Sequence, residues 1–283
     1  MAGQRHDLGY FGPDSVTWRL HADPVQFVAG VRALFLLALH PLAMAGVDQH
    51  STFREDPVGR LRRTGEYLGV VTFGTRAEAD RTAARVRGVH RRVRGVEPES
   101  GVAYEGSDPA LLLWVHCGEI DSFLTIGRRA GIRVSTADAD RYVAEQVRAA
   151  TLAGIPRELV PRSEAELAAY FDRVRPRLRV TAAGRNTARW LFLPPMPAMR
   201  QLATPARAVW ISAAGLSFAT LPAWARRLYG SPGLPPTDLG ASLALRALRT
   251  TTLALPPFLR QTPHYRQALQ RLAATPVRRL EVV

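Results

Sequence analysis

The sequence predicts an all-α protein, and three observations support this prediction. Apolar residues recur at helical spacing through most of the chain. No run shows the sustained alternation of a strand, and no two-residue hairpin signal separates such runs. A capping residue followed by proline also recurs, and it suits a helix start because the side chain accepts from free amides and proline fits the first helical position. These pairs are Asp23-Pro24, Asp56-Pro57, Asp108-Pro109, Thr204-Pro205 and Thr262-Pro263.

We place the helices in order from these starts and from the apolar residues at helical spacing that follow each of them. They are expected over residues 24–39, 57–73, 77–94, 109–128, 136–153, 164–175, 184–193, 205–220, 222–229, 237–255 and 263–273. Thr75 and Glu78 give the third of these helices a capping-box start. Gly74, Gly154 and Gly230 fit helix stops, since glycine is favoured just after a helix end.

The 283 residues suit one large domain or two small ones. We expect a single domain over residues 1–283, with a core over 17–175 and a C-terminal helical layer over 184–275. The proline-rich segment Leu191–Arg200 is the expected bend between the two, and it is too apolar to be a flexible linker.

Composition and charge narrow the class of protein. The net charge is +14, and every basic side chain is arginine. The arginines are spread along the expected helices beside acids, so charge gives little support for nucleic-acid binding. The single cysteine, Cys117, excludes an internal disulfide and a zinc-type cysteine cluster. The N-terminus lacks a signal-peptide core, and the longest apolar run, Ala33–Val47, is too short to span a bilayer. We therefore expect a soluble cytoplasmic protein without a membrane span.

One histidine stands where a core residue is expected. The apolar row of the helix over 77–94 has a gap at His90. This row consists of Ala79, Ala83, Val86 and Val93. Arg87 and Arg94 lie on one flank of His90, roughly 40–60° round the helix. An inward imidazole can bind a metal and two guanidiniums can hold two carboxylates, which are the groups that the iron and propionates of haem b require. The alternative is a satisfied core histidine with two solvated arginines.

Two further helices carry candidate site residues. His116 shares a face with apolar residues of the helix over 109–128 and is expected to point inward. Arg60, Arg63 and Thr64 lie near the start of the helix over 57–73, where positive charge opposes the helix dipole. Positive charge at a helix start is unfavourable, so its presence here favours a functional role for these arginines. A solvated arginine face is the alternative.

Four motifs in register resemble a large family of haem-binding oxygenase domains. Its best-known members are the rubber oxygenases called latex clearing proteins and a fungal oxygenase of mycophenolic acid biosynthesis. The motifs are GPDSVTWRLHADP at 12–24, LHPLAMAGVDQHSTFREDPVGRLRRT at 39–64, VRGVHRRVRG at 86–95 and DPALLLWVHCGEIDS at 108–122, with a weaker likeness in WARRLYG at 224–230. The firm part of the resemblance therefore lies in the N-terminal half of the chain.

The resemblance implies a globin-like helical core that holds haem b, with His90 as the proximal ligand and Arg87 and Arg94 at neighbouring basic positions. It matches Arg60, Arg63 and Thr64 to the distal arginine, lysine and threonine of the rubber oxygenases. Two departures weaken any activity on polyisoprene. Arg63 replaces a lysine that can bind iron, and Asp48 is the only acid in the stretch where those enzymes carry a glutamate base.

Together, the residues and the resemblance predict a haem b-dependent oxygenase or oxidase that acts on a hydrophobic small molecule with dioxygen. In this interpretation His90 binds the iron, Arg60 and Arg63 stabilise developing negative charge, and Thr64 relays a proton. One alternative is a non-catalytic haem carrier or sensor in which His116 is a second ligand. Another is an arginine-rich helical module for nucleic acid. The sequence leaves open whether the chain forms a homodimer.

Overall fold

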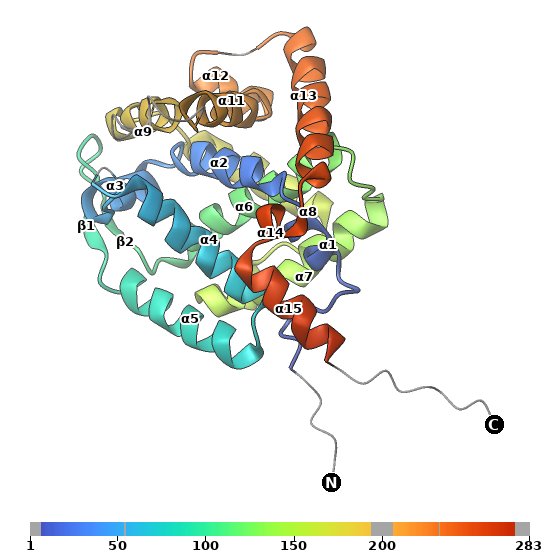
Figure 1. Ribbon diagram of the computed structural model, residues 1–283. Helices are drawn as coiled ribbons and strands as arrows, with labels where there is room; N and C mark the ends of the chain where they lie inside the picture. Colours follow the sequence, from blue (N-terminus) through green and yellow to red (C-terminus); the bar gives the residue numbers. More distant parts are fainter. Residues whose placement is uncertain (1–6, 54, 194–205, 232, 275–283) are drawn as a thin grey trace, which may run out of the picture.

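The computed structural model describes residues 7–53, 55–193, 206–231 and 233–274, and these residues form an almost entirely helical structure (Figure 1). The all-α class is therefore confirmed. The helices are α1 (Val16–His21), α2 (Gln26–Leu37), α3 (Pro41–His50), α4 (Pro57–Phe73), α5 (Arg76–His90), α6 (Pro109–Arg129), α7 (Thr136–Ala153), α8 (Glu164–Val174), α9 (Ala182–Phe192), α11 (Ala206–Ala219), α12 (Ala223–Leu228), α13 (Pro235–Ala254), α14 (Pro257–Arg260) and α15 (Pro263–Ala273). Two 3-10 turns, η1 (Arg157–Leu159) and η2 (Arg175–Arg177), and two strands, β1 (Arg94–Val96) and β2 (Ala103–Glu105), complete them.

Most expected helix starts are confirmed, because the capping residues make the hydrogen bonds that their positions predict. Asp56 accepts from the amide of Gly59 at the start of α4. At the start of α5, Thr75 and Glu78 exchange the two bonds of a capping box. Gly154 ends α7 with a φ of 100°, a conformation that glycine adopts without steric cost.

The helix expected over 77–94 was wrong at its C-terminal end. α5 ends at His90, and the chain turns into β1, which pairs antiparallel with β2 so that Arg94 lies opposite Glu105. The two strands form a hairpin across residues 97–102, and strands of three residues are too short to show an alternating pattern. Arg94 is therefore not on a flank of the helix that carries His90, and its side chain is exposed.

Three short helices were also missed. The segment from His40 to His50 was not among the expected helices, but it forms α3, with Pro41 in the first position and the His40 ring accepting from the amide of Ala43. This start is again a capping residue followed by proline, with histidine as the capping residue. α1 and α14 have only 6 and 4 residues, which is too short for a helical apolar row.

The apolar core is built on α2 and α6, which pack against each other. Phe35 of α2 and Trp114 of α6 are fully buried in it. Leu191, Ala214 and Leu245, from α9, α11 and α13, belong to the same core. The later helices are thus packed directly on the earlier ones. The expected bend over Leu191–Arg200 lies mostly outside the described residues.

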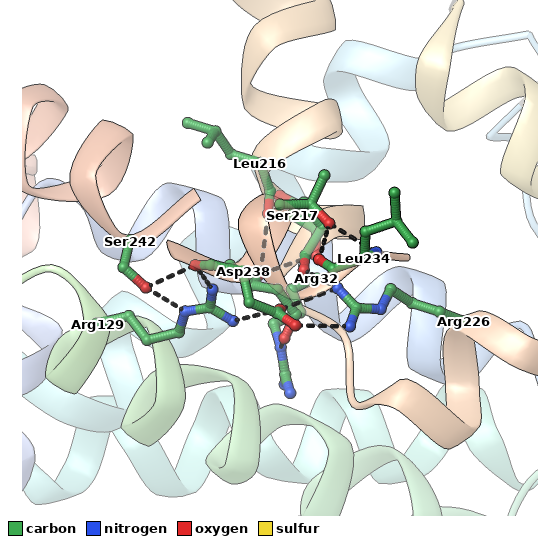
Figure 2. A network of polar contacts seen from close by, with 11 residues as sticks. Arg32, Arg129, Leu216, Ser217, Arg226, Leu234, Asp238 and Ser242 are labelled. Atoms are coloured by element: carbon green, nitrogen blue, oxygen red, sulfur yellow. Dashed lines mark hydrogen bonds and ion pairs between the residues drawn. The ribbon is translucent and has the colours of Figure 1, made fainter. Parts of the chain in front are cut away.

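A buried arginine network also fixes the later helices to the core (Figure 2). Arg32 of α2 donates to Asp121 and Ser122 of α6 at 2.8 and 2.7 Å. Arg226 of α12 forms two bonds of 3.0 Å to the carboxylate of Asp238 on α13, which Arg129 of α6 approaches from the other side. Since a buried guanidinium is tolerated only when it is paired, these bonds specify how α12 and α13 sit on α6.

α6 has the length and apolar composition of a helix that could cross a membrane, and 67% of that stretch is buried inside the protein. α2 and α3 pass the same test only when they are counted together, and they are bent by 107° at their junction. Both features are what core helices of folded proteins also show, so they are weak evidence for a span.

Candidate functional site

One face of α4 carries polar side chains toward the interior. Arg60, Thr64, Tyr67 and Val71 are spaced by four, three and four residues, so they lie on one side of the helix. The Arg60 guanidinium donates to the Ser51 hydroxyl at 3.2 Å and also contacts the Thr64 hydroxyl. Burial and the nearby charge of Arg63 lower the pKa of Arg60 from its ordinary value. Arg60 therefore provides a partly desolvated positive charge next to the Thr64 hydroxyl.

His90 lies at the C-terminal end of α5, which packs against α4 (Figure 1). Its Nδ1 atom is buried and, among the described residues, has no hydrogen-bond partner. Burial and the positive charge of Arg60 both lower the pKa of His90. The ring is therefore neutral near pH 7, and a neutral imidazole has the lone pair that a metal ligand needs.

The other arginines predicted for the site occupy different surroundings. Arg87 donates to the carbonyl of Leu152 at 2.6 Å and so caps the C-terminal end of α7, next to Gly154. The Arg63 side chain is half exposed and bonds to Asp56 and Thr52, both at 3.1 Å. The structure thus places Arg60 within electrostatic reach of His90 and Thr64 in contact with Arg60, whereas it turns Arg63 toward partners at the start of α4.

α6 contributes His116, and also a carboxyl group that sequence reasoning did not assign to the site. The Nε2 atom of His116 is buried and lacks a partner in the described part of the chain, and burial lowers the pKa of His116 to about 4. Glu119 follows one turn later, and no hydrogen bond or ion pair joins it to the described residues. Burial raises the pKa of Glu119 to about 7. Helical spacing from the inward His116 was the signal that could have found it.

Tyr67 of α4 was also missed as a site residue. Its hydroxyl is buried, and no partner for it exists among the described residues. Burial and the charge of Glu119 raise the pKa of Tyr67 to about 12, and Arg87 acts in the opposite direction. Tyr67 therefore lies within electrostatic reach of α5 and α6, and its position on the row of Arg60 and Thr64 was the available signal.

Three helices each carry a buried polar atom that has no partner among the described residues: Tyr67 on α4, His90 on α5 and His116 on α6. Buried polar groups almost always have partners, so such a set indicates a bound group. Within the described ranges no three His, Cys, Asp or Glu side chains gather as a bare metal ion would require. Haem asks for less, because its iron takes a single protein ligand on one face. His90, with its buried and unpartnered Nδ1, can supply that ligand, so the chain has the side chain that haem needs first.

The family model described as the ER-bound oxygenase mpaB/B'/rubber oxygenase catalytic domain matches residues 18–254, from α1 to the end of α13. The chain belongs to this family. The resemblance inferred from four motifs is thus confirmed, and the match continues through the later helices, where the motifs were weak. Membership supports an oxygenase function in general terms.

Two curated relatives are similar to part of the chain. They are the uncharacterized proteins Mb2261 of Mycobacterium bovis and Rv2237 of Mycobacterium tuberculosis, each 31% identical over 154 residues. The aligned part is 52% of this chain and 59% of each relative. No solved structure matches the chain, so the globin-like character of the core stays a prediction.

Proposed function

We propose that this protein is a haem b-dependent oxygenase or oxidase that acts on a hydrophobic small molecule with dioxygen. The family supports oxygenase chemistry. The main support for haem as the cofactor is His90, whose Nδ1 atom is buried without a partner and whose pKa is lowered. A group that binds there replaces a missing hydrogen bond, which otherwise costs free energy in the folded protein.

In this proposal His90 binds the iron. Arg87 and Arg94 are the candidates for the propionates, for which Arg87 would have to release the Leu152 carbonyl and Arg94 would have to turn inward from β1. Haem, when bound, supplies the redox chemistry with dioxygen. Arg60 contributes a fixed positive charge, which stabilises negative charge that develops during the reaction without any reorganisation of the protein. Its pKa, although lowered, belongs to a guanidinium, so Arg60 donates hydrogen bonds and keeps its proton.

In this proposal Thr64 is the residue that relays a proton during the reaction. Its hydroxyl lies between the Arg60 guanidinium and the Arg60 carbonyl, to which it donates at 3.1 Å. Neither of these two partners exchanges a proton near pH 7, so Thr64 would relay a proton by rotating its hydroxyl from the Arg60 carbonyl toward bound substrate or water.

The unpartnered Nε2 of His116 favours a second candidate function, a non-catalytic haem carrier or sensor. Two histidines on the iron would leave no position for dioxygen. The two functions therefore differ in the coordination state of the resting protein.

The visible spectrum of the purified protein separates them. If the protein is an oxygenase, we expect a five-coordinate or water-ligated haem that takes up imidazole, cyanide or carbon monoxide readily. The coordination state should be the same in His116→Ala. A low-spin spectrum that becomes high-spin in His116→Ala would establish the carrier or sensor instead. A cytoplasmic location and the lack of a nucleic-acid partner stay predictions of this proposal.

A further inference from the structure

Large apolar side chains are exposed along α13 and on α14. Leu234 is 70% exposed, Leu239 65%, Leu243 55%, Phe258 66% and Leu259 62%. We call these five residues the α13–α14 apolar face. Single exposed apolar side chains are normal, but several on consecutive elements mark a site of interaction with a protein or a membrane.

The outward position of this face follows from the sequence of α13. Ala241 and Leu245 are buried on the side that packs against α6 and α11. At about 100° per residue, Leu239 and Leu243 lie on the opposite side. α13 thus has two apolar sides and uses one of them inside the protein. In Figure 1 α13 stands at the upper right of the molecule, and its lower end leads to α14 near the middle of the view.

Positive charge accompanies the apolar face. Residues 234–274 contain five arginines and one acid, Asp238, within a chain of net charge +14. Arg246 is exposed about one turn after Leu243, at the edge of the packed side, where the stem of its side chain lies beside Gly131. This combination attracts an anionic surface, whereas a second copy of the chain would bring the same excess of positive charge. An apolar stripe flanked by arginine is also the pattern of helices that lie on anionic bilayers.

We propose that the α13–α14 apolar face docks this protein on the surface of a lipid bilayer that contains anionic headgroups. The leucines and Phe258 would enter the boundary between headgroups and acyl chains, while Arg246 would remain at the headgroups. The proposal is independent of haem. If both hold, docking brings the protein to the phase in which hydrophobic small molecules dissolve.

Co-sedimentation of the purified full-length chain with lipid vesicles tests the proposal. We expect binding to vesicles of phosphatidylcholine mixed with phosphatidylglycerol, and weaker binding to phosphatidylcholine alone or at high salt. The double variant Leu239→Gln/Leu243→Gln should bind at least about tenfold more weakly, because two apolar side chains no longer enter the bilayer. Arg246→Gln should weaken binding to the mixed vesicles and leave binding to phosphatidylcholine unchanged.

Leu159→Gln is the matched control. Leu159 is 49% exposed on η1, outside the face, so this variant should bind as the wild type does. All variants should keep the wild-type melting temperature, since the side chains are exposed, and Phe258→Gln/Leu259→Gln offers a second test on α14. No binding to the mixed vesicles, or full binding by both double variants, would overturn the proposal. A dimer that the same variants dissociate would assign the face to a second copy of the chain.

Discussion

At the scale of single residues, Arg60 and Arg63 differ in a way that their sequence neighbourhood hides. Arg60 is turned inward beside Thr64, while Arg63 bonds to Asp56 and Thr52. We therefore expect both Arg60→Ala and Arg63→Ala to retain haem. Arg60→Ala should slow the oxygen-dependent step about 30- to 150-fold, as expected for the loss of a charge-assisted hydrogen bond of roughly 2–3 kcal/mol. Arg63→Ala should have a smaller effect. Stopped-flow reaction of the reduced protein with dioxygen measures both, and equal effects would contradict this distinction.

Glu119 predicts a pH dependence of stability. Its folded-state pKa is about 7, above the ordinary value of 4.5, because burial disfavours the carboxylate. The unfolded chain therefore releases this proton at lower pH than the folded protein does, and stability falls as the pH rises from 4.5 to 7. The full effect is about 3 kcal/mol at most. The lowered pKa values of His21 and His116 act in the opposite sense, with stability lost as the pH falls below 6.5.

Comparison with Glu119→Gln isolates the carboxyl group from these histidines. Urea unfolding of the haem-free protein at pH 5 and pH 8 should show a larger loss of stability in the wild type than in Glu119→Gln. The same difference between the two pH values in both proteins would show that Glu119 titrates normally.

At the scale of elements, the sequence predicted what local chemistry determines. Asp56 and Asp108 mark the starts of α4 and α6 because capping acts within one turn of the chain. The β1–β2 pair was not predictable in this way, since its hydrogen bonds join residues about ten positions apart. The same limit applies to the site. The inward place of His90 could be inferred from its own helix, but the proximity of Tyr67 to Glu119 depends on how α4 and α6 are arranged.

The contact of α12 with α13 and α6 also depends on tertiary structure, and it yields a prediction. Arg226 is buried, bonds twice to Asp238 and donates to the Ala219 carbonyl. Arg226→Ala should lower the free energy of unfolding by about 1–3 kcal/mol, because the Ala219 carbonyl loses its donor and the half-exposed carboxylate of Asp238 loses two bonds. The matched control, Arg19→Ala, removes a surface ion pair and should cost less than about 1 kcal/mol. Urea denaturation measures both, and a loss below 1 kcal/mol for Arg226→Ala would contradict a structural role for the network.

At the scale of the whole molecule, one apolar core joins α6 to the later helices α11 and α13, while α5 is held through its packing on α4 and α7. Haem bound between α4, α5 and α6 would add to the stability of this structure by mass action, by about 4 kcal/mol at a free concentration 1,000 times the dissociation constant. Both the proposed oxygenase chemistry and this added stability therefore depend on whether His90 holds haem.

The most direct test is the haem content of the purified protein, measured by the pyridine haemochrome assay in wild type, His90→Ala and His50→Ala. His50 is the matched control because it is an exposed histidine at the end of α3 that bonds only to the Arg94 carbonyl. We predict close to one haem b per chain in the wild type and in His50→Ala, and loss of haem with its Soret band in His90→Ala. Full haem content in His90→Ala, or no haem in the wild type after reconstitution, would contradict the account.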